Sequence, residues 1–167
     1  IITVVDVKAP VIVCAPDMTI SCDADRSPAG TGSATATDNC SDAGSIAITF
    51  EDRNNGGLTD CAGSAGVILR VWTATDECGN ASTCEQIITI VDEELPTLSC
   101  PSDITLSCDQ STDPSVAGGT ATATDNCTAT ADIVITYEDA NNGNLAECGG
   151  NAGSVIRTWK AVDACGN

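Results

Sequence analysis

The sequence contains no histidine, and only 2% of its 167 residues are aromatic. Histidine is the most common general base at neutral pH and a frequent zinc ligand, so its absence counts against both catalysis and a zinc site. Basic residues are also scarce, with six against 24 acidic residues and a formal net charge of −18. Such a charge repels nucleic acid and anionic lipid, and it attracts cations.

Long apolar runs are missing as well. The longest runs have the length of a β-strand, so we expect no membrane insertion and no signal peptide in this sequence. Serine and threonine fall on predicted strand faces without a neighbouring base, and the acidic residues fall in loops without an evident pocket. The sequence therefore predicts no enzyme activity and no catalytic residues.

Cysteine, in contrast, is abundant. The chain has eleven cysteines and no CxxC pair, a pattern that favours disulfides formed in an oxidising compartment. A core of Ala, Val, Ile and Thr with so few rings is thin and needs covalent support. We expect an extracellular or cell-surface protein.

An internal repeat organises the chain. The segment IITVVD at residues 1–6 matches IITIVD at residues 87–92, and the cysteines and tryptophans recur at nearly the same offset. The comparison predicts repeat 1 at residues 7–92 and repeat 2 at residues 93–167, with a linker at residues 92–96.

When the repeats are aligned, the pattern is incomplete at both ends of the sequence. Repeat 2 has no counterpart of the last strand of repeat 1, and residues 1–6 form such a last strand with no domain before it. Two interpretations stay open: a window cut from a longer tandem array, or strand addition between neighbouring subunits. In the second case the polymerisation strand is Ile1, Ile2, Thr3, Val4, Val5 and Asp6.

Apolar and polar residues alternate with period two, and Gly, Asn, Asp and Pro separate the runs. In repeat 1 this predicts strands at 18–21, 32–37, 46–51, 67–75 and 84–91, a weak strand within 52–66, and no helix. Five or more antiparallel strands in so short a repeat indicate an all-β fold of tandem immunoglobulin-like or fibronectin-III-like β-sandwiches.

Strand alternation also predicts which side chains face the core. Ile68, Arg70, Trp72, Ala74 and Asp76 share one face, as do their counterparts in repeat 2. Trp72 and Trp159 should anchor the two cores, with Phe50 and Tyr137 facing them.

Strand ends suggest the disulfide pairing. Strands 32–37 and 67–75 both finish in Ala-x-Asp-x-Cys at the same end of the predicted sandwich. Spacing cannot prove a pairing, because six cysteines allow about fifteen. The pairs we expect are Cys14–Cys84, Cys22–Cys61, Cys40–Cys78, Cys108–Cys148 and Cys127–Cys165, with Cys100 unpaired.

The aspartates after these strands have two interpretations. Asp38, Asp76, Asp125 and Asp163 can cap loop N–H groups as Asx turns, or they can contribute to calcium sites at the repeat junctions. The only cofactor we expect is Ca²⁺. Its candidate ligands are Asp92, Glu93, Glu94, Asp125, Asn126, Asp163, Glu51 and Asp52.

Three Asn-x-Ser/Thr tripeptides predict acceptor sites for N-linked glycans. They begin at Asn39, Asn80 and Asn126, and two of them carry cysteine in the middle position.

Several longer motifs together resemble the hyalin repeat, in particular the cysteine-rich tandem versions in large secreted bacterial surface proteins. They are CPSDITLSC (100–108), GGTATATDNC (118–127), ITYED (135–139), RTWKAVDACGN (157–167) and STCEQIITIVD (82–92). The resemblance implies an immunoglobulin-like fold, an extracellular setting, a role in adhesion or matrix structure, and no catalytic residues.

These patterns together predict a structural repeat of an extracellular fibre or rod-like surface protein, whose partners are further copies or adjacent repeats arranged head to tail. Two alternatives stay open: an adhesion module that binds carbohydrate or protein, and a subunit that polymerises by donor-strand addition.

Overall fold

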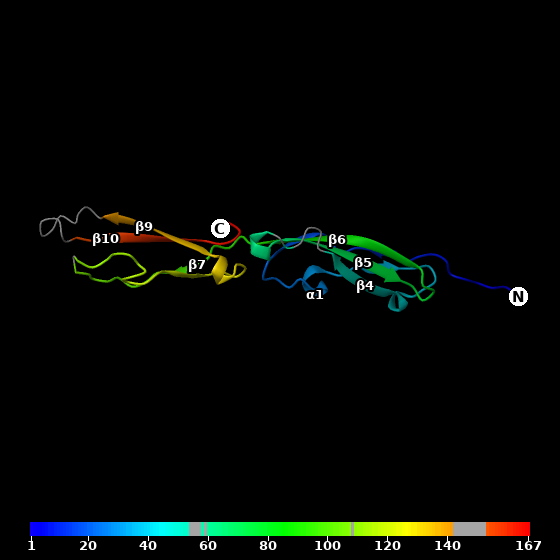
Figure 1. Cartoon of the computed structure of the whole chain (residues 1–167). Helices are drawn as coiled ribbons and strands as arrows, with labels where there is room; N and C mark the ends of the chain where they lie inside the picture. The colour runs from blue at the N-terminus through cyan, green and yellow to red at the C-terminus, as the bar shows by residue number, and fades with distance from the viewer. Residues whose placement is uncertain (54–57, 59, 108, 142–152) are drawn as a thin grey trace. The chain divides into compact units, whose positions relative to one another are not determined.

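The computed structural model describes residues 1–53, 58, 60–107, 109–141 and 153–167. The chain divides into two compact units, Ile1–Asp92 and Glu93–Asn167, at the boundary that the repeat predicts. Both units consist mainly of β-strands, as expected, and the described helices are single short turns (Figure 1).

Unit 1 contains a four-stranded sheet and a two-stranded sheet. The larger sheet has the order β2 (Met18–Ser21), β6 (Ala81–Val91), β5 (Gly66–Thr75) and β4 (Ala47–Arg53). In the smaller sheet, β1 (Val11–Val13) pairs with β3 (Thr35–Thr37), and β1 also contacts β5 and β6. The short helices of this unit are α1 (Pro28–Thr31), η1 (Ala43–Ser45) and η2 (Cys61–Gly63).

Three features of unit 1 differ from the sequence prediction. Strand β1 and helix α1 were not expected, and both are too short to produce a periodic signal. Strand β2 runs parallel to β6, whereas the prediction was antiparallel pairing throughout. Parallel neighbours need a long connection, and local periodicity carries no information about partners so distant in sequence.

The core of unit 1 is built on one face of β5. Ile68, Arg70, Trp72, Ala74 and Asp76 are all buried, which confirms the predicted face. The aromatic partners are less buried than predicted. Phe50 packs on Trp72 with 5.3 Å between ring centroids but is 46% exposed, because it lies on β4 at the edge of the sheet.

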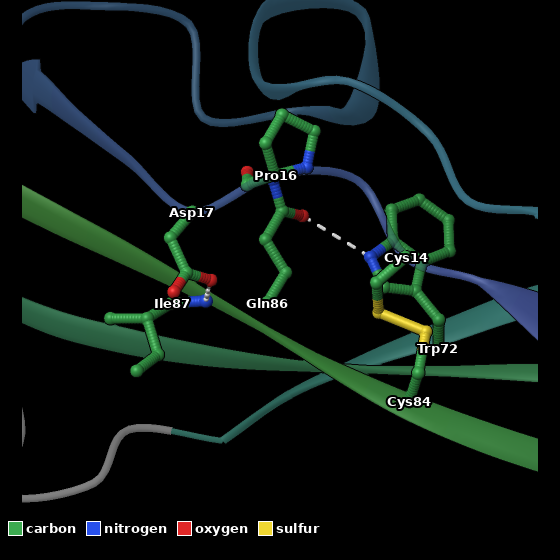
Figure 2. The surroundings of a disulfide bond; sticks show 7 residues. All are labelled: Cys14, Pro16, Asp17, Trp72, Cys84, Gln86 and Ile87. Carbon is green, nitrogen blue, oxygen red and sulfur yellow. Dashed lines mark hydrogen bonds between the residues drawn. A yellow bond between two sulfur atoms is a disulfide. The ribbon is translucent and has the colours of Figure 1, made fainter.

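A disulfide joins Cys14 to Cys84, the pairing that strand ends suggested (Figure 2). Cys84 lies on β6 directly opposite Trp72 on β5, and Cys14 follows β1. The bond therefore links the small sheet to the large one beside the core tryptophan. It also closes a loop over a sequence separation of 70 residues, which restricts the unfolded chain.

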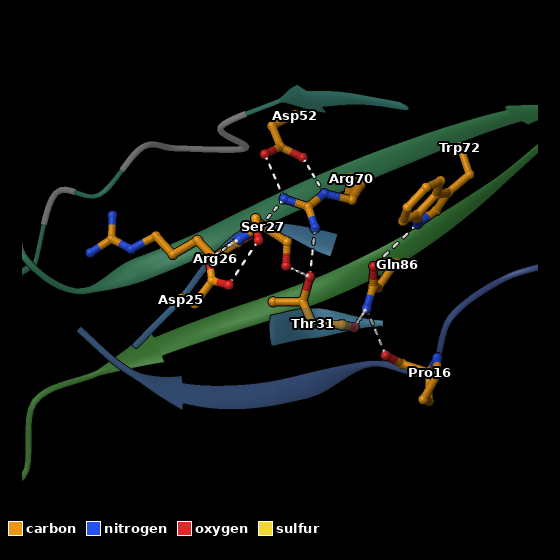
Figure 3. A network of polar contacts seen from close by, with 9 residues as sticks. All are labelled: Pro16, Asp25, Arg26, Ser27, Thr31, Asp52, Arg70, Trp72 and Gln86. Atoms are coloured by element: carbon orange, nitrogen blue, oxygen red, sulfur yellow. Dashed lines mark hydrogen bonds and ion pairs between the residues drawn. The ribbon is translucent and has the colours of Figure 1, made fainter. Parts of the chain in front are cut away.

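The most deeply buried charge in unit 1 is Arg70, which is 1% exposed (Figure 3). Its Nε and Nη2 donate to the two carboxylate oxygens of Asp52 at 2.6 and 2.8 Å. Nη1 donates to Thr31 Oγ1, Nη2 also donates to the carbonyl of Arg26, and the guanidinium lies 4.6 Å from the centroid of Phe50. The network thus connects β5, β4 and α1.

A second buried polar side chain, Gln86 on β6, completes the link between the sheets (Figures 2 and 3). Its Oε1 accepts a hydrogen bond from the indole N–H of Trp72 at 3.1 Å. Its Nε2 donates to the carbonyls of Pro16 and Thr31 at 2.9 and 2.7 Å. All polar atoms of this amide are therefore satisfied inside the core, as burial requires.

Unit 2 contains two strand pairs: β7 (Thr97–Ser99) with β8 (Thr122–Thr124), and β9 (Val134–Asn141) with β10 (Val155–Val162). One short helix, η3 (Thr130–Asp132), precedes β9. Arg157 on β10 pairs with both carboxylate oxygens of Asp139 and lies 4.4 Å from the ring centroid of Tyr137. Like Phe50, Tyr137 is more exposed than predicted, at 43%.

Residues 104–107, the counterpart of β2, form no strand in unit 2, although the sequence predicts one there. In unit 1 the partner of β2 is β6. Among the described residues of unit 2, β10 pairs only with β9, so residues 104–107 have no strand to pair with.

The Arg70 network generates a stability prediction. Replacing Asp52 with Ala leaves the buried guanidinium without its counter-charge, and breaking such a pair costs about 3–5 kcal/mol. We expect the free energy of unfolding of unit 1 to fall by that amount. The measurement is denaturant unfolding followed by Trp72 fluorescence in a Trp159→Phe background.

The matched control is Asp139→Ala in unit 2, followed by Trp159 fluorescence in a Trp72→Phe background. Its arginine makes the same bidentate contact, but the Arg157 side chain is 18% exposed and water can replace the lost carboxylate. We expect a smaller loss. Equal losses in the two units would show that the burial of Arg70 is unimportant.

Candidate functional site

Four strands end in an aspartate that caps the following loop. Asp38 follows β3, Asp76 follows β5, Asp125 follows β8 and Asp163 follows β10. Each accepts at least one backbone N–H from a residue two to four positions further along the chain. These contacts confirm the Asx-turn interpretation for all four residues.

The loops after β3 and β8 have the same geometry. Oδ1 of Asp38 accepts from the N–H groups of Cys40 and Ser41 at 2.8 and 3.0 Å. Oδ1 of Asp125 accepts from the corresponding N–H groups of Cys127 and Thr128 at 2.8 and 2.7 Å. One carboxylate oxygen thus closes each turn, and the other remains available for a further contact.

The loops after β5 and β10 explain the repeated Cys-Gly-Asn motif. Asp76 accepts from the N–H groups of Cys78 and Asn80 with Oδ1, and from the side-chain amide of Asn80 with Oδ2. Gly79 has a φ of +88°, which favours glycine. Asp163 accepts from the backbone and side chain of Asn167 in the same way, and Gly166 has a φ of +93°.

These hydrogen bonds shift the pKa of the aspartates. Burial raises the pKa of Asp76, but the hydrogen bonds from Asn80 and Cys78 outweigh it and hold that pKa below its usual value. The pKa of Asp163 is lowered by the same balance of burial against hydrogen bonds from Asn167. The N–H groups of Cys40 and Ser41 lower the pKa of Asp38, against a smaller effect of burial.

The predicted bridge between Cys40 and Cys78 is not formed, and both thiols are free and exposed. The Cys40 Sγ accepts a hydrogen bond from Asn39 at 2.8 Å. It also lies within 4.8 Å of carboxylate oxygens of Asp6 and Asp38. Cys40 therefore lies beside Asn39, Asp6 and Asp38 and is not bonded to Cys78.

The remaining cysteines divide into three groups. Cys100 is free and exposed, as expected. Cys22, Cys61, Cys127 and Cys165 each take part in a disulfide, and their pairing as Cys22–Cys61 and Cys127–Cys165 stays a prediction. The predicted Cys108–Cys148 bond lies outside the described residues.

The expected calcium ligands of unit 1 lie in three different environments. Both oxygens of Asp52 accept hydrogen bonds from Arg70, so this side chain serves the core. Glu51 pairs with Arg53 at the surface, at 3.1 Å. Asp92, the last residue of unit 1, is buried.

In unit 2, Asp125 and Asp163 cap their loops as described above. Glu93, Glu94 and Asn126 are exposed.

The candidate glycan acceptors also differ from one another. Asn39 and Asn126 are exposed. The side-chain amide of Asn80 donates to Asp76 at 2.8 Å and to the carbonyl of Asp6 at 3.3 Å. Glycosylation of Asn80 would replace one of the two amide hydrogens and so remove one of these hydrogen bonds, which makes Asn80 the least suitable of the three.

From the sequence we assigned no metal role to Asp6. In the structure Asp6 lies beside Asp38, which is in the loop that follows β3. Its side chain is half-buried, and its carbonyl accepts the hydrogen bond from Asn80. Asp6, Asp38 and Cys40 each offer a ligand atom within 4.8 Å of the others. The sequence repeat could have indicated Asp6 as a candidate ligand, because Asp6 matches Asp92, which is an expected calcium ligand.

No described helix is long and apolar enough to cross a membrane. A shallow depression of about 190 Å³ on β9 and β10 is lined by Thr136, Tyr137, Glu138, Thr158 and Lys160. Pockets that bury a small-molecule ligand usually enclose about 300–1,000 Å³, so this depression supports no ligand assignment.

The depressed pKa values predict a loss of stability in acid. A carboxylate with a lowered pKa in the folded state stabilises the fold above its unfolded pKa, and this stabilisation disappears as the pH falls through the folded pKa. Below about pH 4 we therefore expect unit 1 to lose stability as its loop aspartates are protonated. Asp76→Asn should reduce this pH dependence, as measured by thermal unfolding between pH 7 and 2. An unchanged pH dependence in the variant would contradict the assignment of this loss of stability in acid to Asp76.

A scan against models of known protein families finds no match to this chain, and a search of curated proteins finds no similar sequence.

Proposed function

We propose that this chain is a tandem-repeat structural segment of an extracellular fibre or rod-like surface protein. One observation carries the proposal: two strand pairs of unit 1 recur in unit 2 with the same register. The β1–β3 and β4–β5 pairs reappear as β7–β8 and β9–β10. The Arg70–Asp52 ion pair reappears as Arg157–Asp139, and the aspartate-capped loops reappear with matching hydrogen bonds. Small units that repeat one design suit a linear array.

The disulfides support an extracellular site of action. Six cysteines of the described chain are disulfide-bonded, which is typical of proteins in oxidising compartments outside the cytoplasm. We propose an immunoglobulin-like topology for each unit, and in unit 1 the two sheets joined by Cys14–Cys84 would face each other. The resemblance to hyalin repeats agrees with this role.

The Cys14–Cys84 bond gives unit 1 a mechanical property. A pulling force applied at the two ends of the unit acts on the chain outside the disulfide loop first. The residues between the two cysteines cannot extend while the bond is intact. A fibre built from such units resists unravelling under load, which is the function we propose.

Donor-strand polymerisation is the second candidate, and the sequence match between residues 1–5 and the 87–91 half of β6 favours it. In unit 1, the 87–91 half of β6 lies between β5 and β2. The matching position of unit 2, between β10 and residues 104–107, holds no strand among the described residues. Residues 1–5 are exposed and match the sequence of that half-strand at four of five positions. The repeat register would place Ile2 of a second copy opposite Val155.

The mechanical role predicts how far unit 1 extends under force. In single-molecule stretching we expect the 70-residue loop between Cys14 and Cys84 to stay closed without reductant. Reduction should lengthen the unfolded unit by about 230–250 Å, since an extended chain spans about 3.3–3.6 Å per residue. Cys14→Ser/Cys84→Ser should show the longer extension without reductant. Identical extensions in all cases would contradict a load-bearing bond.

The fibre role predicts that antibodies against this chain decorate thin extracellular fibres in electron micrographs of intact producing cells. Antigen found only after permeabilisation would overturn the proposal.

Boiled samples on non-reducing SDS gels then separate the two candidates. A single very large polypeptide indicates a covalent array, whereas a ladder of small chains indicates strand exchange.

A further inference from the structure

Cys100 is free and exposed, although the matching cysteine of unit 1 is bonded. In unit 1, Cys14 directly follows β1 and bonds to Cys84 on β6 (Figure 2). In unit 2, Cys100 directly follows β7, and β7 pairs with β8 in the same register in which β1 pairs with β3. Cys100 therefore occupies the position of a bonded cysteine but has a free thiol.

Unit 1 shows where a bonding partner of Cys100 would lie. Cys84 lies on β6 directly opposite Trp72 on β5. Trp159 on β10 matches Trp72, and each tryptophan pairs with the aromatic residue of the neighbouring strand in the same register. Strand β7 contacts β10, as β1 contacts β5. A cysteine placed opposite Trp159, on a strand that pairs with β10, would therefore reach Cys100.

The core face of β10 is less covered than the core face of β5. Four side chains on one face of β5 are buried: Ile68, Arg70, Trp72 and Ala74. Their counterparts on β10 are only half-buried: Val155, Arg157, Trp159 and Ala161. Ile104, in the segment that matches β2, is 51% exposed. Removing apolar surface from water is favourable, so a strand laid along this face would be stabilised.

Strand β6 shows which residues such a strand needs. One of its faces carries four residues that serve the core of unit 1: Cys84, Gln86, Ile88 and Ile90. The cysteine forms the disulfide, and the amide accepts a hydrogen bond from the indole of Trp72. Both isoleucines are at most 1% exposed. The pattern Cys-x-Gln-x-Ile-x-Ile therefore covers the tryptophan and supplies the thiol.

We propose that Cys100 is a site of covalent attachment between repeats. It bonds to the cysteine of a β6-type strand that belongs to a further copy of the repeat, and that strand pairs with β10 opposite Trp159. This inference rests on the proposed function, because a fibre of such repeats supplies the strand.

The bond forms by thiol–disulfide exchange with a disulfide oxidant such as glutathione disulfide. The thiolate of Cys100 attacks one sulfur of the oxidant and displaces a glutathione thiolate. The thiolate of the incoming cysteine then attacks the Cys100 sulfur and displaces the second glutathione. Two protein thiols are thereby oxidised, and one glutathione disulfide is reduced to two glutathiones, which take up the two protons.

The bond would give unit 2 what Cys14–Cys84 gives unit 1, a covering strand fixed beside the core tryptophan. Backbone hydrogen bonds and apolar contacts alone would let a pulling force withdraw that strand. A disulfide at Cys100 prevents this withdrawal, and structural disulfides of secreted proteins resist reduction by glutathione. Each junction between copies would then be covalently closed.

The test uses the complete chain and a synthetic peptide with the sequence of residues 81–92, ASTCEQIITIVD. The two are mixed at micromolar concentration in a glutathione redox buffer, and mass spectrometry of proteolytic fragments locates the disulfides. Strand pairing brings the peptide thiol to Cys100 at an effective concentration of about millimolar. We therefore expect bonding at Cys100 to be at least about tenfold faster than at the exposed thiols of Cys40 and Cys78.

A second peptide is the matched control. It exchanges Ile88 with Asp92 and Ile90 with Thr89, so its composition and its cysteine are unchanged while the core-facing side becomes polar. This peptide should bond Cys100 no faster than it bonds Cys40. Equal rates of the first peptide at all three thiols, or equal rates of the two peptides at Cys100, would overturn the proposal.

Cys100→Ser separates strand pairing from bond formation. In this variant with Trp72→Phe, a Cys84→Ser form of the peptide should still bind and shift the emission of Trp159 to shorter wavelength, because the strand covers the half-buried indole. The control peptide should leave the emission unchanged. An emission that the first peptide does not move would contradict pairing with β10.

Native fibres show where the strand comes from. Mass spectrometry without reductant should find Cys100 linked to a fragment of the β6 type. Small chains that appear on SDS gels only after reduction would assign the strand to a second copy, and a very large polypeptide that reduction leaves unchanged would assign it to a further repeat of the same chain. A free Cys100 thiol in the fibres would overturn the proposal. It would leave the fibre role standing, because the antibody and stretching experiments do not depend on Cys100.

Discussion

The buried Arg70 guanidinium holds unit 1 together. It connects β5 to Asp52 on β4, to Thr31 in α1 and to the carbonyl of Arg26, and it stacks on Phe50. A core with one tryptophan and many alanines offers little apolar area. The polar network supplements the apolar packing, since each guanidinium nitrogen donates at least one hydrogen bond and Asp52 neutralises the charge.

The disulfide and Gln86 extend this arrangement across the unit. Cys14–Cys84 and the Gln86 contacts to Pro16 and Thr31 join β6 to segments that are far away in sequence. Both lie beside Trp72, so the covalent bond, the indole and the amide occupy one region of the core. We propose that the features that stabilise this small domain also let it resist extension under load.

The strand-end aspartates use their two carboxylate oxygens in different ways. One oxygen of Asp38 ends a strand by capping its loop, which is a local task that any such unit needs. The other oxygen is buried beside Asp6 and has no protein donor. Asp76, by contrast, uses both oxygens within its own loop. The two loops therefore differ in how many of the carboxylate oxygens accept hydrogen bonds from the protein.

The sequence alone determined the all-β class, the unit boundary and the buried face of β5, and it suggested the capped turns and the Cys14–Cys84 pairing. All of these depend on period-two alternation, on local turn chemistry, or on which strand ends meet. Only the tertiary structure decided the parallel pairing of β2 with β6, the use of Asp52 by Arg70, and the free thiols of Cys40 and Cys78. It also brought Asp6 to Asp38. These features depend on contacts between segments distant along the chain, and neither propensity nor spacing specifies which partner a buried charge or a thiol will meet.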